Sequence, residues 1–198
     1  KWPIHPQKCL TEVEKGCPYD CGLCAEHRQQ TCCALLEVTQ RCNLNCNVCF
    51  ASSGGNVEDP SFDKIKEWLK VRVEAGRPFI HISGGEPNDL PEIIRMIKEM
   101  GFPYIQLNTN GLRLSQEPEY VKILKEAGLS SVFMQFDGTK DDIYRKLRGR
   151  NLLAEKENAI KNCGDNNLGI VLVPTIVPGV NEDNIGDIIN FGLSKAPD

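Results

Sequence analysis

The sequence predicts an α/β fold, a partial (β/α)6-type TIM barrel with about five βα units, preceded by a cysteine-rich metal-binding segment. Three observations lead to this prediction. Short apolar runs alternate with longer amphipathic segments from residue 33 onward, and nine of the ten cysteines lie in the first 49 residues. The 198-residue chain is also too short for a closed eight-stranded barrel of about 250 residues. We therefore expect residues 1–32 to form the cysteine-rich segment and residues 33–198 to form a partial barrel, truncated where a sixth strand should begin.

The individual elements are predicted from apolar spacing and from glycines that follow helices. Ile93, Ile94 and Ile97 form one apolar stripe, as expected for an amphipathic helix. Gly101 and Gly128 come directly after predicted helices, where a left-handed cap is common. The expected strands span residues 34–38, 79–83, 104–108, 132–136 and 169–174, and the expected helices span 62–75, 91–100, 119–127, 153–162 and 184–194.

Composition argues against several classes of protein. A hydrophobic content of 40% and a charged content of 25% are ordinary for a globular protein. The net charge is -4 and there is no long basic run, so nucleic acid is not an expected partner. We find no apolar stretch long enough to span a bilayer and no signal peptide, and we expect a cytoplasmic location.

The cysteines are clustered rather than spread along the chain. Their C-x2-C and C-x3-C spacings, in a chain of this size, favour metal binding in a reducing compartment over a disulfide framework. Cys42, Cys46 and Cys49 follow an apolar run with the spacing C-x3-C-x2-C. Three thiolates on one loop can hold three corners of a cubane iron–sulfur cluster, whereas a cluster that only carries electrons normally takes four cysteines. The spacing therefore predicts an iron that is open to a ligand other than protein.

A second group of cysteines repeats this spacing in the amino-terminal segment, at Cys17, Cys21 and Cys24. We expect a second [4Fe-4S] cluster there, with Cys32 as its fourth ligand and Cys9 or Cys33 as rivals for that position. A structural zinc site is the alternative, because zinc also accepts four thiolates.

Each predicted strand is followed by residues that can contribute to one site. The first strand leads into the cysteines, and the later strands lead into Gly-Gly-Glu-Pro (84–87), Asn-Thr-Asn-Gly (108–111), Gln-Phe-Asp-Gly (135–138) and Pro-Thr-Ile-Val-Pro-Gly-Val-Asn (174–181). Each of these later loops is a weak signal alone, because Gly-Gly and Asn-Gly are ordinary turn formers. Together they predict a site, because the carboxyl ends of parallel barrel strands share one rim.

With these motifs, residues 33–198 resemble the radical S-adenosylmethionine (SAM) superfamily. The resemblance implies that Cys42, Cys46 and Cys49 hold a [4Fe-4S] cluster and that SAM chelates the open iron through its amino and carboxylate groups. One electron would then split SAM into methionine and a 5′-deoxyadenosyl radical, which abstracts hydrogen from the substrate. The implied SAM contacts are the methionine amino group with Gly84, Gly85 and Glu86, the ribose with Asn108 and Gln135, and the adenine with Ile176 or Val177.

One position departs from the family pattern. The residue before the third cysteine is commonly aromatic in the family and is Val48 here, so the adenine contact would be aliphatic or would come from Phe50. Residues 16–24, 107–112 and 173–181 also resemble an archaeal-type group that includes a pterin C-methyltransferase and tetraether lipid synthases, whose members carry more chain upstream and downstream. This narrower resemblance implies C-methylation or C–C bond formation on a pterin or a lipid.

Three more side chains have a functional and a structural interpretation. Arg148 lies in a basic patch and is expected to pair with the SAM carboxylate or an anionic substrate group, while its basic neighbours fit a solvated helix face. His81 fits a hydrogen-bonded histidine at the interior or rim better than a ligand. Cys163 fits a buried thiol, and a catalytic radical thiol is the alternative.

The expected protein is thus a radical SAM enzyme that acts on a small-molecule or lipid substrate. The clusters imply an anaerobic cytoplasm and an electron donor such as ferredoxin or flavodoxin, and a lipid substrate would imply a location peripheral to the membrane. One alternative is an electron-transfer or metal-binding module without catalysis, which would form no 5′-deoxyadenosine from SAM. Another is a fragment that cleaves SAM but no longer binds its substrate.

Overall fold

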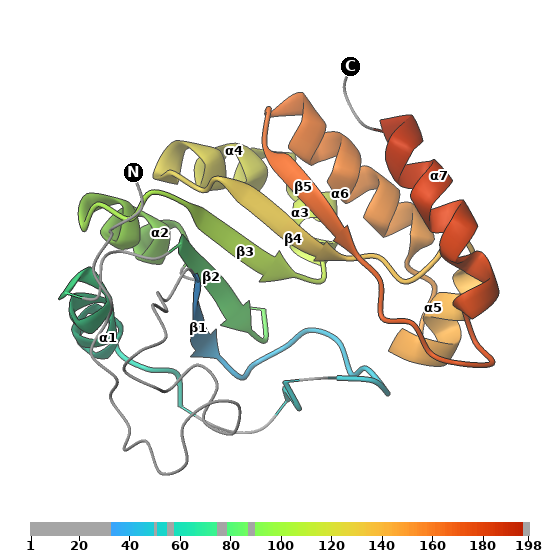
Figure 1. Cartoon of the computed structure of the whole chain (residues 1–198), viewed down its shortest axis with the longest axis horizontal. Coiled ribbons are helices and arrows are strands. Elements are labelled where there is room, and N and C mark those ends of the chain that lie inside the picture. The colour runs from blue at the N-terminus through green and yellow to red at the C-terminus, as the bar shows by residue number, and fades with distance from the viewer. Residues whose placement is uncertain (1–32, 50, 55–57, 75–78, 87–89, 196–198) are drawn as a thin grey trace, which may run out of the picture.

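The computed structural model describes residues 33–49, 51–54, 58–74, 79–86 and 90–195. Its centre is a five-stranded sheet in the order β1-β2-β3-β4-β5, with every neighbouring pair parallel (Figure 1). The strands are β1 (Cys33–Thr39), β2 (Phe79–Gly84), β3 (Ile105–Thr109), β4 (Ser131–Gln135) and β5 (Gly169–Val173). The α/β fold and the five βα units predicted from the sequence are confirmed.

The five longer helices, one after each strand, agree with the prediction to within a few residues. They are α1 (Phe62–Glu74), α2 (Leu90–Glu99), α4 (Pro118–Ala127), α6 (Leu153–Asp165) and α7 (Ile185–Lys195). Gly101 and Gly128 have φ angles of 81° and 109°, the left-handed conformation expected after a helix. Among the described residues, no helix is both long enough and apolar enough to cross a membrane.

Two short helices and one turn were not predicted. They are α3 (Leu112–Gln116), α5 (Asp141–Arg148) and the 3-10 turn η1 (Glu182–Asn184). With 5 residues, α3 is too short to show a repeated apolar stripe, whereas α5 has one in Ile143, Tyr144 and Leu147, but only over 8 residues that are mostly charged. Helix α3 packs against α6 in the helical layer, whereas the last turn of α5 contacts Asn47, beyond the end of β1.

The two faces of the sheet have different chemistry. On the outer face, Ile80 and Ile82 of β2, Leu107 of β3 and Met134 of β4 are buried under the helices in one apolar core. The alternate residues form the inner face, and many are polar: His81, Ser83, Gln106, Asn108, Ser131 and Gln135. Because successive residues of a strand point to opposite faces, this alternation follows directly from the sequence.

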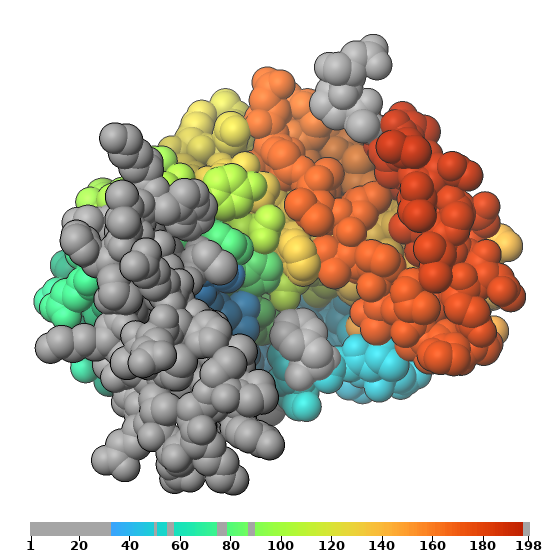
Figure 2. Space-filling view, in the orientation of Figure 1, coloured from blue at the N-terminus to red at the C-terminus, as the bar shows by residue number. Residues whose placement is uncertain are grey.

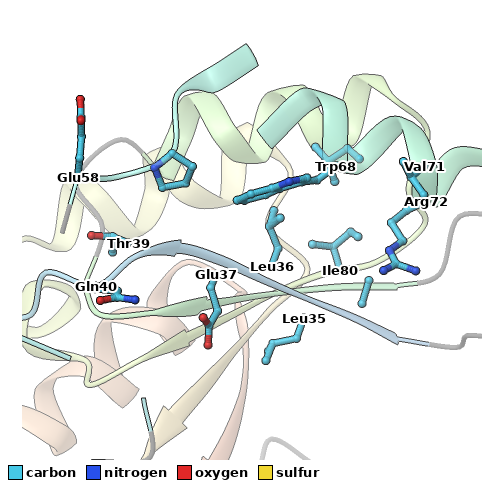
Figure 3. A pocket seen from close by; sticks show the side chains of 13 residues that line it. Leu35, Leu36, Glu37, Thr39, Gln40, Glu58, Trp68, Val71, Arg72 and Ile80 are labelled. Atoms are coloured by element: carbon cyan, nitrogen blue, oxygen red, sulfur yellow. The ribbon is translucent and has the colours of Figure 1, made fainter. Parts of the chain in front are cut away.

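A cavity of about 590 Å³ lies between edge strand β1 and helix α1 (Figure 3). Trp68 of α1 faces Leu36 of β1 across it, and Glu37 and Arg72 stand at its sides. None of the three clustered cysteines at residues 42–49 belongs to its lining. This cavity therefore does not contain the cysteines, although Leu35 of β1 lines both it and the cavity at the strand ends.

Candidate functional site

The carboxyl ends of all five strands meet around a second cavity of about 380 Å³, which we call the rim cavity. Figure 2 shows the cyan surface that follows β1 beside the orange surface that follows β5. The rim cavity is lined by strand-end residues and by Arg148 of α5; the lining includes Cys42, Cys46, Cys49, Gly84, Gly85, Glu86, Asn108, Gln135, Arg148 and Thr175. The structure thus brings together most of the residues that the sequence singled out.

The three cysteines lie on the cysteine loop, residues 41–49, which follows β1. All three are partly buried, and none forms a disulfide bond. Within the described part of the chain, no three His, Cys, Asp or Glu side chains are close enough to hold a single metal ion. A cubane cluster has a different requirement, because each cysteine binds a separate iron. Three unpaired thiols around one cavity therefore fit an iron–sulfur cluster better than a mononuclear site.

The thiols differ in their surroundings. Burial raises the pKa of Cys42, and the nearby Glu86 carboxylate acts in the same direction. Burial also acts to raise the pKa of Cys49, but backbone N–H groups of Ser53 and Ala51 lower it below its ordinary value overall. The Ser53 N–H lies 3.4 Å from the Cys49 sulfur. N–H groups at a ligating sulfur are one of the means by which a protein tunes a cluster.

The cysteine loop is anchored by a small apolar cluster and by helix α5. Leu44 is buried against Leu112, Tyr144 and Leu152. The Asn47 backbone N–H donates to the carbonyl oxygen of Leu147 at 3.1 Å, and its side-chain Nδ2 donates to that of Lys146 at 2.9 Å. These carbonyls belong to the last turn of α5, where no helix partner remains for them. Helix α5 therefore positions the loop.

Arg148, the last residue of α5, connects the cysteine loop to two other strand ends. Its Nε and Nη2 donate to the two carboxylate oxygens of buried Asp137 at 2.8 and 2.9 Å. Nη1 donates to the carbonyl oxygen of Val48 at 2.9 Å, and Nη2 also donates to Thr175 Oγ1 at 3.0 Å. Four of its five N–H groups thus have partners in the protein. Among the residues that the structure describes, the second N–H of Nη1 has no hydrogen-bond partner.

Gly84 and Gly85 are required by the close approach of two backbone segments. A Cβ on Gly84 would lie 2.1 Å from the Thr39 carbonyl oxygen, and one on Gly85 would lie 1.7 Å from that of Arg41. Gly84 also has a φ angle of 117°, a backbone conformation that residues with a side chain rarely adopt. The Gly85 N–H donates to the Thr39 carbonyl at 2.8 Å and the Glu86 N–H donates to the Arg41 carbonyl at 2.6 Å. The Gly-Gly pair therefore fixes the second loop against the start of the cysteine loop.

Glu86 connects the second loop to the third. Thr109 Oγ1 donates to one carboxylate oxygen at 2.6 Å, and the Asn110 N–H donates to the other at 3.2 Å. Burial raises the pKa of Glu86, while these two hydrogen bonds act in the opposite direction. Both oxygens are therefore used inside the rim, which fits a positioning role.

The amides expected near the ribose are both at the rim cavity. Asn108 Nδ2 donates to Ser83 Oγ at 3.2 Å, and Gln135 Nε2 donates to Asp137 Oδ2 at 2.6 Å. Ile176 and Val177 do not belong to the cavity lining, whereas Thr175 and Val173 before them do. Val48 lines the cavity, and Phe50 lies outside the described residues.

Lys156 of α6 contacts two residues of the rim cavity lining, and sequence reasoning missed it. Its side chain is fully buried, and its ammonium donates to the Asn110 carbonyl at 2.5 Å and to Gln135 Oε1 at 3.4 Å. Burial lowers its pKa to about 8, opposed by the Asp137 carboxylate. Because lysine is almost always exposed, nothing in the sequence indicates that a lysine on an amphipathic helix is buried. Only the packing of α6 under the third and fourth loops reveals it.

The remaining sequence predictions divide between described and undescribed residues. His81 is hydrogen-bonded at the inner face, and Cys163 is buried, with its pKa raised to about 12 by burial. Cys33 is the first residue of β1. The other residues proposed for a second cluster or a zinc site lie outside the described residues: Cys9, Cys17, Cys21, Cys24 and Cys32.

Comparisons with known proteins agree with this geometry. The model of the radical SAM superfamily matches residues 36–192. The chain is 47% identical, over 193 residues, to the 7,8-dihydro-6-hydroxymethylpterin dimethyltransferase of Methanocaldococcus jannaschii, covering 93% of this chain and 38% of that protein. It is 32% identical over 168 residues to a probable GTP 3',8-cyclase of Methanothermobacter thermautotrophicus, covering 81% of this chain and 53% of the relative.

Solved structures show the same fold at low sequence identity. Streptococcus suis SuiB bound to its precursor peptide SuiA has a TM-score of 0.71 at 14% identity, over 84% of this chain and 37% of that one. Methylornithine synthase (PylB) has a TM-score of 0.64 at 19% identity, over 84% of this chain and 51% of that one. The chain thus spans between a third and about half of the length of these proteins.

Proposed function

Because the chain belongs to the radical SAM superfamily, we propose that it forms the catalytic part of a radical SAM C-methyltransferase that acts on a pterin. The observation that carries the proposal is the set of three unpaired thiols around the rim cavity, with Gly84 and Gly85 packed against the same loop. A [4Fe-4S] cluster there would supply the electron that cleaves SAM to methionine and a 5′-deoxyadenosyl radical. The substrate follows from the similarity to the pterin dimethyltransferase.

The residues of the rim then have distinct proposed roles. Cys42, Cys46 and Cys49 hold the cluster, and the 84–86 loop receives the methionine amino group of SAM. Asn108 and Gln135 face the ribose, because an amide can both donate and accept there. Ile176 or Val177, in the loop after β5, approaches the adenine when the ligand is bound.

Arg148 has a double role in this proposal. It fixes Val48, and with it the loop between the second and third cysteines. Its remaining N–H on Nη1 is available for the SAM carboxylate, since a guanidinium–carboxylate hydrogen bond is charge-assisted and strong.

Further parts of the proposal concern the whole protein. Cys17, Cys21 and Cys24, with Cys32, are proposed to bind a second [4Fe-4S] cluster. A ferredoxin or flavodoxin is the proposed electron donor, and an anaerobic cytoplasm is the proposed location. These features follow from the cysteine spacing and the needs of a low-potential cluster.

Anaerobic protein reconstituted with iron and sulfide tests the proposal. With SAM and a strong reductant, we expect 5′-deoxyadenosine, and with 7,8-dihydro-6-hydroxymethylpterin present we expect a methylated pterin by mass spectrometry. Cys46→Ala should lower 5′-deoxyadenosine formation at least about 1000-fold, or about 4 kcal/mol of transition-state stabilisation. Cys163→Ala is the matched control, because this buried cysteine lies away from the cavity lining and should leave turnover within about twofold. Iron-loaded protein that forms no 5′-deoxyadenosine would instead be an electron-transfer or metal-binding module.

A further inference from the structure

The inner face of the sheet carries a row of polar side chains that the SAM site does not use. His81, Gln106 and Ser131 are register partners on β2, β3 and β4. His81 Nδ1 lies 3.0 Å from Gln106 Oε1, and Gln106 Nε2 donates to Ser131 Oγ at 2.9 Å. The Tyr104 hydroxyl donates to the same Ser131 oxygen at 2.7 Å. In closed barrels this position is filled mainly by bulky branched residues, so a hydrogen-bonded row indicates a different use.

The row determines which atom His81 presents to the cavity. Because Gln106 turns its Nε2 toward Ser131, it presents its carbonyl oxygen Oε1 to His81. An acceptor at that point requires the proton of a neutral imidazole on Nδ1, which leaves the lone pair on Nε2. Burial lowers the pKa of His81, which favours the neutral ring at pH 7. Nε2 is therefore a hydrogen-bond acceptor.

The ring of His81 is held in place and reaches the rim cavity. It packs edge-on against Phe133 of β4, with ring centroids 4.9 Å apart and an interplanar angle of 82°. Leu35, His81 and Phe133 all line the rim cavity, together with the three cysteines. In the part of the chain that the structure describes, Nε2 of His81 has no hydrogen-bond partner.

These residues lie deeper in the barrel than the SAM contacts. His81 precedes Gly84 by three residues in β2, so its Cα lies about 10 Å further from the rim along the strand. A fused two-ring heterocycle can span this distance and still place one edge beside the cofactor.

We propose that Leu35, His81 and Phe133 form the subsite for the ring system of the substrate, a planar heteroaromatic molecule with an N–H group that donates to Nε2 of His81. The identification of that molecule as a pterin depends on the proposed function above. Phe133 and Leu35 supply apolar contact for the ring, and Nε2 supplies a directed acceptor. An alkyl chain in the same place would bury Nε2 without a partner, which is unfavourable. The subsite therefore selects a polar heterocycle over a lipid chain.

Equilibrium binding under anaerobic conditions, without reductant and so without turnover, tests the subsite. The probe is 7,8-dihydro-6-hydroxymethylpterin, added to the full-length, cluster-loaded protein in the presence of SAM. His81→Phe keeps a ring against Phe133 but removes the acceptor, and we expect it to weaken pterin binding at least about tenfold. His81→Gln returns an acceptor oxygen and should recover affinity to within about threefold of the native protein.

Tyr104→Phe is the matched control, because it removes a hydroxyl from the same row but from a residue outside the cavity lining. We expect its pterin affinity to stay within about twofold of that of the native protein. SAM affinity, measured on each variant, shows whether the cluster end of the cavity is intact.

The outcomes separate this proposal from the proposed function. If the native protein binds SAM but no pterin, the pterin assignment fails and the subsite fails with it. If pterin binds His81→Phe as tightly as the native protein, the subsite is wrong while the proposed function stands. Displacement of the pterin by a long-chain alcohol would overturn the selectivity for a heterocycle.

Discussion

The two faces of the sheet differ in the polarity of their side chains and in what they contribute to the protein. The outer face, buried under the helices, is apolar and continuous, and it contains side chains such as Ile82 and Leu107 that are at most 1% exposed. The inner face is formed by the alternate residues of the same strands, and it carries hydrogen-bonding side chains such as Ser83 and Gln106. We therefore expect the outer face to contribute most of the stability, which leaves the inner face available to bind ligands.

The largest expected effect comes from Arg148 of α5, which lies at the strand ends and belongs to neither face of the sheet. Arg148→Met leaves the Asp137 carboxylate buried without its partner, and loss of one member of a buried pair costs about 3–5 kcal/mol. We expect this loss in the free energy of unfolding from urea titration, together with weaker iron binding because Val48 is released.

The double variant Arg148→Met with Asp137→Asn is the control for that experiment. Removing both charges should recover a large part of the stability but not the anchoring of the cysteine loop. Equal stability of Arg148→Met and the native protein would show that the pair contributes nothing and that the rim is held by other contacts.

The next prediction compares substitutions of two adjacent residues, Ile82 and Ser83, which lie on opposite faces of β2. Ile82→Ala removes a fully buried outer side chain and should cost about 3 kcal/mol of unfolding free energy. Ser83→Ala removes one inner hydroxyl, the acceptor for Asn108, and should cost about 1 kcal/mol or less. Chemical denaturation of both variants measures the difference, and similar losses would contradict the division between the faces.

The last effect is a pH dependence of stability caused by Lys156, which lies behind the rim cavity and donates to Asn110 and Gln135 of its lining. Burial lowers the pKa of Lys156 from an ordinary value of 10.5 to about 8 in the folded protein. Between these pH values the unfolded chain binds a proton that the folded chain does not, so the free energy of unfolding rises with pH. Relative to Lys156→Met, the native protein should gain up to about 3 kcal/mol as the pH rises from 8 to 10.5.

The comparison with Lys156→Met removes the contribution of other groups in this pH range. Burial raises the pKa of Tyr120 and of Cys163 to about 12, so each of these groups makes stability fall as pH rises above its ordinary value. Both proteins share this loss. A difference between the two proteins that does not change with pH would show that Lys156 keeps its ordinary pKa.

Much of the fold and part of the candidate site could be predicted from the sequence. The short apolar runs predicted the five strands, and the cysteine spacing predicted three thiols on one loop. Helix α5 was not predicted because its apolar residues Ile143, Tyr144 and Leu147 span little more than one turn among charged residues, which drew attention to the basic patch instead. The role of Arg148 in holding Val48 was missed with it.

By itself, the sequence determined the order of strands and helices, the cysteine loop and the glycines at the end of β2, because these depend on spacing along the chain. The tertiary structure alone decided which polar groups meet: Arg148 with Val48, 100 residues apart, and Lys156 with Asn110, 46 residues apart. The physical reason is that strand register and helix packing set these distances, and the burial that gives a charge its importance depends on neighbours that are remote in sequence.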